Sequence, residues 1–144
     1  MSTSIDIATA RTIVSEALAH GRAQGMQPLA VIVLDDGGHP VAFEREDGAS
    51  YGRFDIARGK AHGAISIGVG SRTLNGMAVE RPHFIAAATA AVGGSLVPVP
   101  GGVLVRDADG RTLGAVGISG DNSDNDEAAA VAGITAAGLQ AVTG

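Results

Sequence analysis

The chain has 144 residues, of which 45% are hydrophobic and only 3% are aromatic. Its 10 basic and 15 acidic residues give a formal charge of −5, which argues against nucleic acid or an anionic membrane as the main partner. The absence of cysteine excludes disulfides, thiolate metal sites and cysteine nucleophiles.

The mean hydropathy of +0.23 argues against an intrinsically disordered chain. Its core must be built from Ala, Val, Ile and Leu, and such small side chains bury little area per residue, which favours stabilisation by oligomerisation. Residues 1–6 lack the basic and apolar regions of a signal peptide. No apolar run reaches the ~18 residues of a membrane span, so we expect a cytoplasmic protein.

Residues 5–24 have apolar side chains at helical spacing, and either Ser4 or Asp6 is suited to cap the start of this first helix. A short apolar run over residues 29–34 is followed by the turn signal Asp35-Asp36-Gly37-Gly38 and by alternating residues 41–45. This pattern predicts a β-hairpin.

Residues 51–69 place six apolar or small residues within one ~100° arc and predict the central helix. The alanine-rich stretch that follows Arg81-Pro82 predicts a short helix or a partly ordered segment to Ala91, and residues 93–102 read as a loop.

A second hairpin is predicted from residues 102–106 and 112–118, which flank Asp107-Ala108-Asp109-Gly110. The last helix is predicted over residues 124–141, with Ser123 and Asp126 resembling a capping box. Two hairpins without obligatory crossovers imply an α+β domain over residues 1–144 with a mainly antiparallel sheet and helices on its faces.

Several motifs together resemble one known family, the haem-degrading GlcG/HbpS-like (DUF336) family, which also includes the carboxy-terminal domain of PduO-type proteins. They occur in family order from about Ile7 to the end of the chain and are Asp35-Asp36-Gly37-Gly38, Arg45-Glu46-Asp47-Gly48-Ala49, Ala57-Arg58-Gly59-Lys60-Ala61, Gly114-Ala115-Val116-Gly117-Ile118-Ser119-Gly120 and Asp126-Glu127. Three positions depart from the family pattern and point to an altered ligand pocket: Glu46 replaces a usual methionine, His62 a small hydroxyl residue and Leu104 a frequent proline.

The resemblance implies a profilin-like layered α/β/α domain with a mainly antiparallel five-stranded sheet. It also implies a homo-oligomer, a tetramer or an octamer, that binds a small molecule or cofactor at a site near subunit interfaces, and it makes haem a candidate cofactor.

The central helix carries three candidate site residues. On a regular helix, Arg58 and His62 share one flank, whereas Lys60 lies roughly 160° from His62, so Lys60 and His62 are not expected in one compact site within a single subunit. His62 is a candidate general base or haem iron ligand because an unperturbed imidazole changes its charge near neutral pH. Lys60 is a candidate partner for a propionate or carboxylate, or else an exposed lysine that lies along the helix.

Other candidates lie at the ends of the predicted elements. Arg45 and Asp47 follow a strand and either bind a ligand carboxylate or pair with each other to shape the turn. His83, at a helix start, is a candidate pocket residue or iron ligand, and His20 is a further iron ligand candidate or else a surface residue at a helix end. Asp126 and Glu127 are candidates for ligand binding and for a catalytic base respectively, or they only favour the helix start.

Three functions remain open from the sequence. The first is a haem-binding protein, with Lys60 and Arg45 on the propionates and His62, His83 or His20 at the iron. The second is a cofactor-independent isomerase, lyase or hydrolase that acts on a small carboxylate or carbonyl compound, with His62 or Glu127 as the base. The third is a noncatalytic assembly or sensory module, in which the helix face of Gly59 and Gly63 packs subunits together.

Overall fold

The computed structural model describes residues 4–144, so the first three residues of the segment considered for a signal peptide lie outside it. The elements follow the order α1 (Ile7–Ala23), β1 (Ala30–Asp35), β2 (Pro40–Arg45), α2 (Arg53–Ile67), α3 (Ser71–Glu80), α4 (Pro82–Ala91), β3 (Gly102–Arg106), β4 (Thr112–Ser119), α5 (Ser123–Ala136) and β5 (Gln140–Val142). None of the helices in the described part of the chain is long and apolar enough to cross a membrane.

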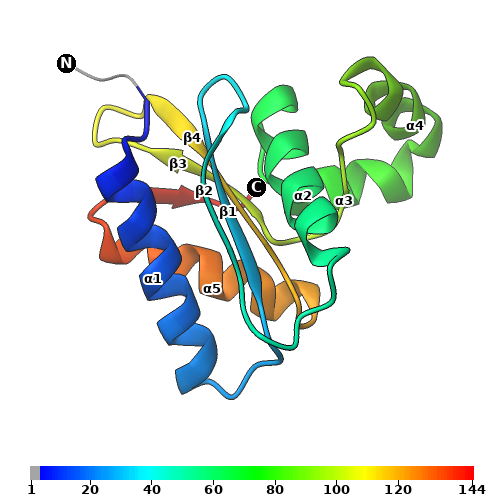
Figure 1. Cartoon of the computed structure of the whole chain (residues 1–144). Helices are drawn as coiled ribbons and strands as arrows, with labels where there is room; N and C mark the ends of the chain where they lie inside the picture. The colour runs from blue at the N-terminus through cyan, green and yellow to red at the C-terminus, as the bar shows by residue number, and fades with distance from the viewer. Residues whose placement is uncertain (1–3) are drawn as a thin grey trace.

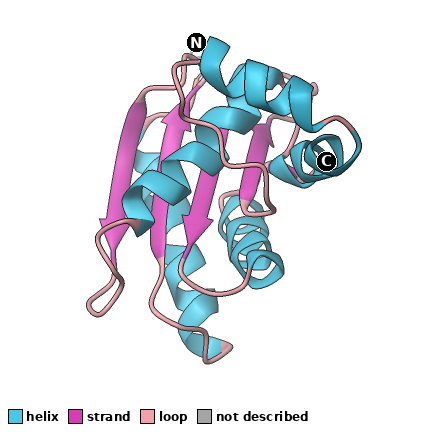
Figure 2. Cartoon of the chain, turned by 90° about the vertical axis from the view of Figure 1, so that its right-hand side faces the viewer, coloured by secondary structure: helices cyan, strands magenta, loops and turns pink. Residues whose placement is uncertain are grey.

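The five strands form one antiparallel sheet in the order β2-β1-β4-β3-β5. Helices α1 and α5 pack together on one face, and α2 covers the other face over β1, β4 and β3 (Figures 1 and 2). The expected α+β class and helix–sheet–helix layering are therefore confirmed.

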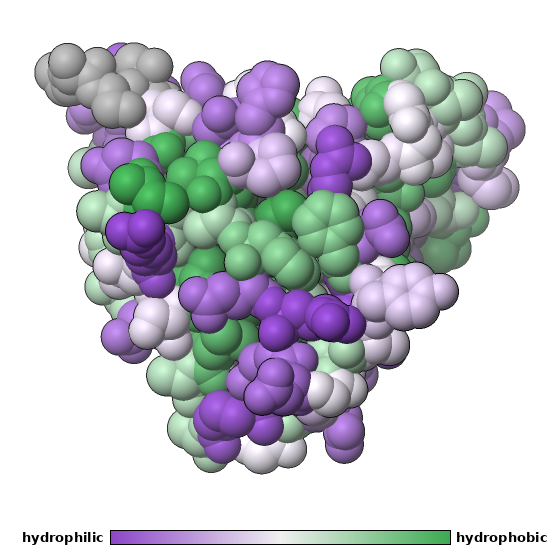
Figure 3. All heavy atoms as spheres, viewed as in Figure 1, coloured by the Kyte–Doolittle hydropathy of each residue, from purple (hydrophilic) through white to green (hydrophobic). Residues whose placement is uncertain are grey.

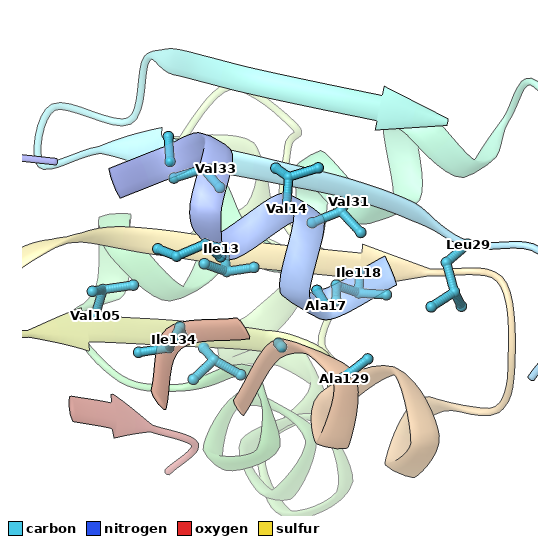
Figure 4. Packing of buried hydrophobic residues seen from close by; sticks show 14 of the residues in the cluster. Ile13, Val14, Ala17, Leu29, Val31, Val33, Val105, Ile118, Ala129 and Ile134 are labelled. Atoms are coloured by element: carbon cyan, nitrogen blue, oxygen red, sulfur yellow. The ribbon is translucent and has the colours of Figure 1, made fainter. Parts of the chain in front are cut away.

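Strand alternation divides the core between the two faces of the sheet. Val31, Val33 and Ile118 point toward α1 and α5 and contact Ile13 and Ile134 there (Figure 4). The intervening residues point toward α2 and pack against its small side chains, and they include Ile32, Leu34, Leu104 and Ala115. Each central strand is thus buried on both faces, which explains its continuous apolar run.

Both hairpins use the same aspartate-centred turn. The Asp35 N–H donates to the carbonyl of His39 at 2.9 Å, while Asp35 Oδ1 accepts the N–H groups of Gly37 at 3.0 Å and His39 at 2.9 Å. Asp107 makes the same set of bonds in the second turn. Gly38 takes a φ of +82° that ordinary residues avoid. The aspartate-x-x-glycine signal therefore predicted both hairpins correctly.

Three predictions about the helices were wrong. A separate helix, α3, occupies Ser71–Glu80, where no element was expected, and α5 ends at Ala136 instead of residue 141. Gly138, at a φ of +78°, ends that helix, and the chain then pairs as β5 with β3. The cap of α5 is also not Ser123: Asn122 accepts the N–H of Asn125 at 2.8 Å.

The small-residue face of α2 is covered by its own chain. A side chain at Gly59 would overlap Val97, and one at Gly63 would overlap Leu96. The segment after α4 therefore packs directly on this face, so these glycines serve packing within the chain and not the subunit contact considered above.

Candidate functional site

Lys60 and Asp126 form an ion pair inside the molecule, between α2 and α5. Lys60 Nζ lies 3.0 Å from Asp126 Oδ2, and the two side chains are only 3% and 1% exposed. Lys60 also donates to the carbonyl of Ile118 at 2.9 Å, and Asp126 Oδ1 accepts the N–H of Asp121 at 2.9 Å. Burial lowers the pKa of Lys60 and raises the pKa of Asp126, and each partner opposes the other's shift. Both charged groups are thus bonded to other groups of the protein and are not available to a ligand.

Glu127 belongs to a surface network that joins α3 to α5. Arg72 Nη2 lies 3.0 Å from Glu127 Oε1 and 2.6 Å from Asp124 Oδ1. Hydrogen bonds to Glu127 and then to Asp124 raise the pKa of Arg72, so the guanidinium stays charged. The Glu127 carboxylate is held by this cation, which favours a structural role at the start of α5.

His62 is held in one orientation by a backbone carbonyl. Its Nδ1 lies 2.7 Å from the oxygen of Ser95, and because a carbonyl only accepts, Nδ1 carries the proton. In the neutral ring this leaves Nε2 with its lone pair, the form that serves as a base or a metal ligand. A shallow hollow of about 260 Å³ lies beside Ser95 and is lined by Asp55 and Arg58.

Arg45 and Asp47 line a hollow of about 420 Å³ at the end of β2. They do not form an ion pair with each other among the described residues; Arg45 Nη1 instead donates to the carbonyl of Ala49 at 3.1 Å. Glu46, between them, pairs with Arg22 Nε at 3.0 Å and accepts the N–H of Leu29 at 2.7 Å. Arg22, which also lines this hollow, is therefore paired, whereas Arg45 is left for an external anion.

His20 lines a second hollow of about 410 Å³, between the end of α1 and the start of α5. Met26 shares its wall, and the other side is lined by Asp121, just before α5, and by Asn125 in its first turn. The His20 imidazole makes no hydrogen bond within residues 4–144, so both ring nitrogens are open to a ligand. Arg22, two residues along the chain, lines the hollow of Arg45 and Asp47 instead.

His83 lies in the first turn of α4, on the outermost helix of the molecule (Figure 1). It is exposed, as is the adjacent Phe84, over whose ring the Arg81 guanidinium stacks at 4.9 Å.

The predicted residues do not meet in one place within the chain. Arg45 and Asp47 share a hollow and Lys60 pairs with Asp126, whereas Glu127, His62 and His83 lie on three separate surfaces. The expected separation of Lys60 from His62 is confirmed by their different partners. Across the described residues, no three His, Asp or Glu side chains form a metal-binding group.

Several polar residues at the carboxy end of β4 and nearby were not predicted as site residues from the sequence. Arg53, at the start of α2, donates to Ser119 Oγ at 3.0 Å, and Asp121 accepts the N–H of Gln27 at 2.8 Å. The only sequence signal was the glycine-rich, charged loop of residues 46–53 just before the helix, since Ser119 lies 66 residues further along the chain.

Comparison with solved structures gives the same fold. HbpS is similar at 26% identity with a TM-score of 0.79 over 94% of this chain and 91% of that chain. A double mutant of Streptomyces reticuli HbpS is similar at 26% identity with a TM-score of 0.78 over 94% and 88%. A PduOC:haem complex is similar in fold, at 20% identity with a TM-score of 0.84 over 95% and 97%.

No curated protein matches the chain by sequence. The family model described as haem degrading protein HbpS-like matches residues 5–135, nearly the whole chain. The chain therefore belongs to the haem-degrading HbpS-like family.

Proposed function

We propose that this protein binds haem at the hollow between α1 and α5, with His20 as the iron ligand. The observation that carries the proposal is that His20 and Met26 line one hollow while the His20 ring has no partner among residues 4–144. Histidine and methionine are both axial ligands of haem iron, and bound haem would supply the iron chemistry of the family. His62 is the alternative ligand, because its Nδ1 donates to the carbonyl of Ser95 and leaves Nε2 for the iron.

The hollow at the end of β2 offers a cation, Arg45, for a haem propionate. Arg45 lines it and has no carboxylate partner, so its guanidinium can hold a propionate through two parallel hydrogen bonds. Arg22 lines the same hollow but is already paired with Glu46. Lys60, expected to take this role, is paired inside the molecule, so we assign the propionate contact to Arg45.

One chain covers only part of such a ligand. Both hollows are open to solvent, and no aromatic residue lines either of them. Bound cofactors are usually buried over most of their surface, so we propose that a second copy of the chain closes the site. In this proposal the site lies at a subunit interface.

Haem titration followed by the Soret band tests the assignment. The unaltered protein should saturate with a shifted Soret maximum, and His20→Ala should weaken binding by about tenfold or more because the iron loses its ligand. Arg45→Gln should weaken binding less, by roughly threefold to tenfold. Arg111→Gln, in the β3–β4 turn, makes the same charge change and should have no effect.

Variants of the other histidines decide between the iron ligands. If His20→Ala keeps a normal Soret band and either His83→Ala or His62→Ala loses it, the iron ligand is the histidine whose replacement removes the band. Absence of any Soret shift in the unaltered protein would overturn the haem proposal itself.

A further inference from the structure

Arg53 is a cation without a carboxylate partner at the carboxy end of β4. The half-buried side chain donates from Nη1 to Ser119 Oγ at 3.0 Å, and Ser119 is completely buried. None of the ion pairs among residues 4–144 includes Arg53. The buried serine therefore fixes the direction of the guanidinium without neutralising its charge.

The nearest buried charges do not cancel it. Lys60 already has its own counter-ion in Asp126. The pKa of Lys60 is lowered mainly by burial, against the attraction of Asp126, and Arg53 lowers it further through like-charge repulsion. Arg53 is therefore an uncompensated positive charge beside a neutralised ion pair.

Arg53 faces a hollow of about 330 Å³ whose loop wall presents donors. Gly48, Ala49 and Ser50 form that wall, and the N–H groups of Gly48 and Ser50 donate to no acceptor in the described residues. The Ser50 hydroxyl is equally unused. The carbonyl of Ala49 is occupied by Arg45.

The carboxylate of Asp121, which follows Gly120 of this hollow, is already hydrogen-bonded to other groups. Asp121 Oδ2 accepts the N–H of Gln27, which lines the same hollow, and Oδ1 accepts from the N–H of Asn122 and the Nδ2 of Asn125. These hydrogen bonds lower the pKa of Asp121, and the one from the Gln27 N–H has the largest effect. The Asp121 carboxylate is thus bonded to these groups and not to Arg53. The hollow as a whole offers hydrogen-bond donors and one free cation.

The geometry points to a small-oxyanion site here, in which Arg53 and the donors of the 48–50 loop bind a carboxylate or phosphate group. A planar guanidinium anchored at one nitrogen keeps its remaining N–H groups for a bidentate contact with such a group. Neither His20 nor Arg45 lines this hollow, although Pro28 borders both it and the hollow of Arg45.

Titration of the full chain without haem tests this site, with inorganic phosphate and succinate as two separate probes. Saturable binding should shift the amide NMR signals of Gly48 and Ser50, and the probe that binds more tightly identifies the ligand class. Arg53→Gln should weaken binding by about tenfold because the charged hydrogen bonds are lost. Arg53→Lys keeps the charge but not the planar fork, and it should recover only part of the affinity.

Arg111→Gln is the matched control, since it removes one positive charge at the opposite end of β4 and should leave binding unchanged. Equal weakening by Arg111→Gln and Arg53→Gln would reduce the effect to net charge and overturn the inference, as would the absence of saturable shifts with both probes. Because no haem is present, these outcomes leave the haem proposal unaffected.

Discussion

At the scale of single residues, the Lys60–Asp126 pair dominates the energetics of the interior. Removing one member of a buried ion pair leaves an unpaired charge and costs about 3 kcal/mol or more, whereas replacing both by neutral residues is often neutral. Lys60→Met should therefore lower the free energy of unfolding by about 3 kcal/mol, and Lys60→Met with Asp126→Asn should recover most of this loss. Urea unfolding of the two variants measures both values.

The pH dependence of Lys60→Met follows from the direction of the Asp126 shift. Burial raises the pKa of Asp126 above 3.8, and removal of Lys60 raises it further because the lysine charge opposes that rise. The folded state then binds more protons than the unfolded state, so the stability of the variant should increase as the pH falls through the raised pKa. A defect that is equally large at about pH 7 and about pH 5 would contradict this assignment.

Helical periodicity predicted the direction of these residues but not their surroundings. The angle between Lys60 and His62 on one helix follows from the sequence alone. The partner of Lys60 does not, because Asp126 lies 66 residues away, at the start of a helix that packs on the other face of the sheet. Gly101 lets a strand pass close to the lysine, since a Cβ there would lie 2.9 Å from Nζ. Such long-range packing has no local signal.

At the scale of elements, the turns carried strong local signals and the missed segments did not. The aspartate and glycine of each hairpin set that turn through bonds that span only four residues. Helix α3 buries just Ser71 and Leu74, so it lacks a wide apolar stripe. Strand β5 has three residues and depends on its pairing with β3. Both elements owe their structure to tertiary contacts.

The contact of α2 with the sheet depends on glycine in β4. A side chain at Gly117 would overlap the carbonyl of Ala57 and lie 2.9 Å from Ala61 Cβ. Gly117→Ala should lower the free energy of unfolding by about 3 kcal/mol, because the helix must move away from the strand. Gly76→Ala has open space around it within α3 and should instead stabilise the protein by roughly 0.5–1 kcal/mol. Thermal and urea unfolding of the pair provides the comparison, and equal effects would refute tight packing at Gly117.

At the scale of the whole molecule, α4 is an apolar helix of which only Ile85 and Ala88 are buried by the rest of the chain. It packs mainly on α3, and Figure 3 shows apolar surface over this lobe at the upper right. Its exposed side chains include Phe84, Ala86, Ala87 and Ala90, and His83 is its only ionisable residue. A helix that is apolar on all sides is normally buried. We propose that a second copy of the chain covers it, because two faces of small residues can approach closely and match each other by symmetry.

Ala87→Arg tests this contact, since a charge at the centre of the face cannot be buried without a partner. The mass in solution, measured by light scattering, should fall by about half or more, while the helical circular dichroism signal stays unchanged. Ala108→Arg places the same side chain at an exposed position in the β3–β4 turn, and it should leave the mass unaltered. An Ala87→Arg protein with the mass of the unaltered assembly would show that α4 faces solvent, and the assembly implied by the family would then need a different surface.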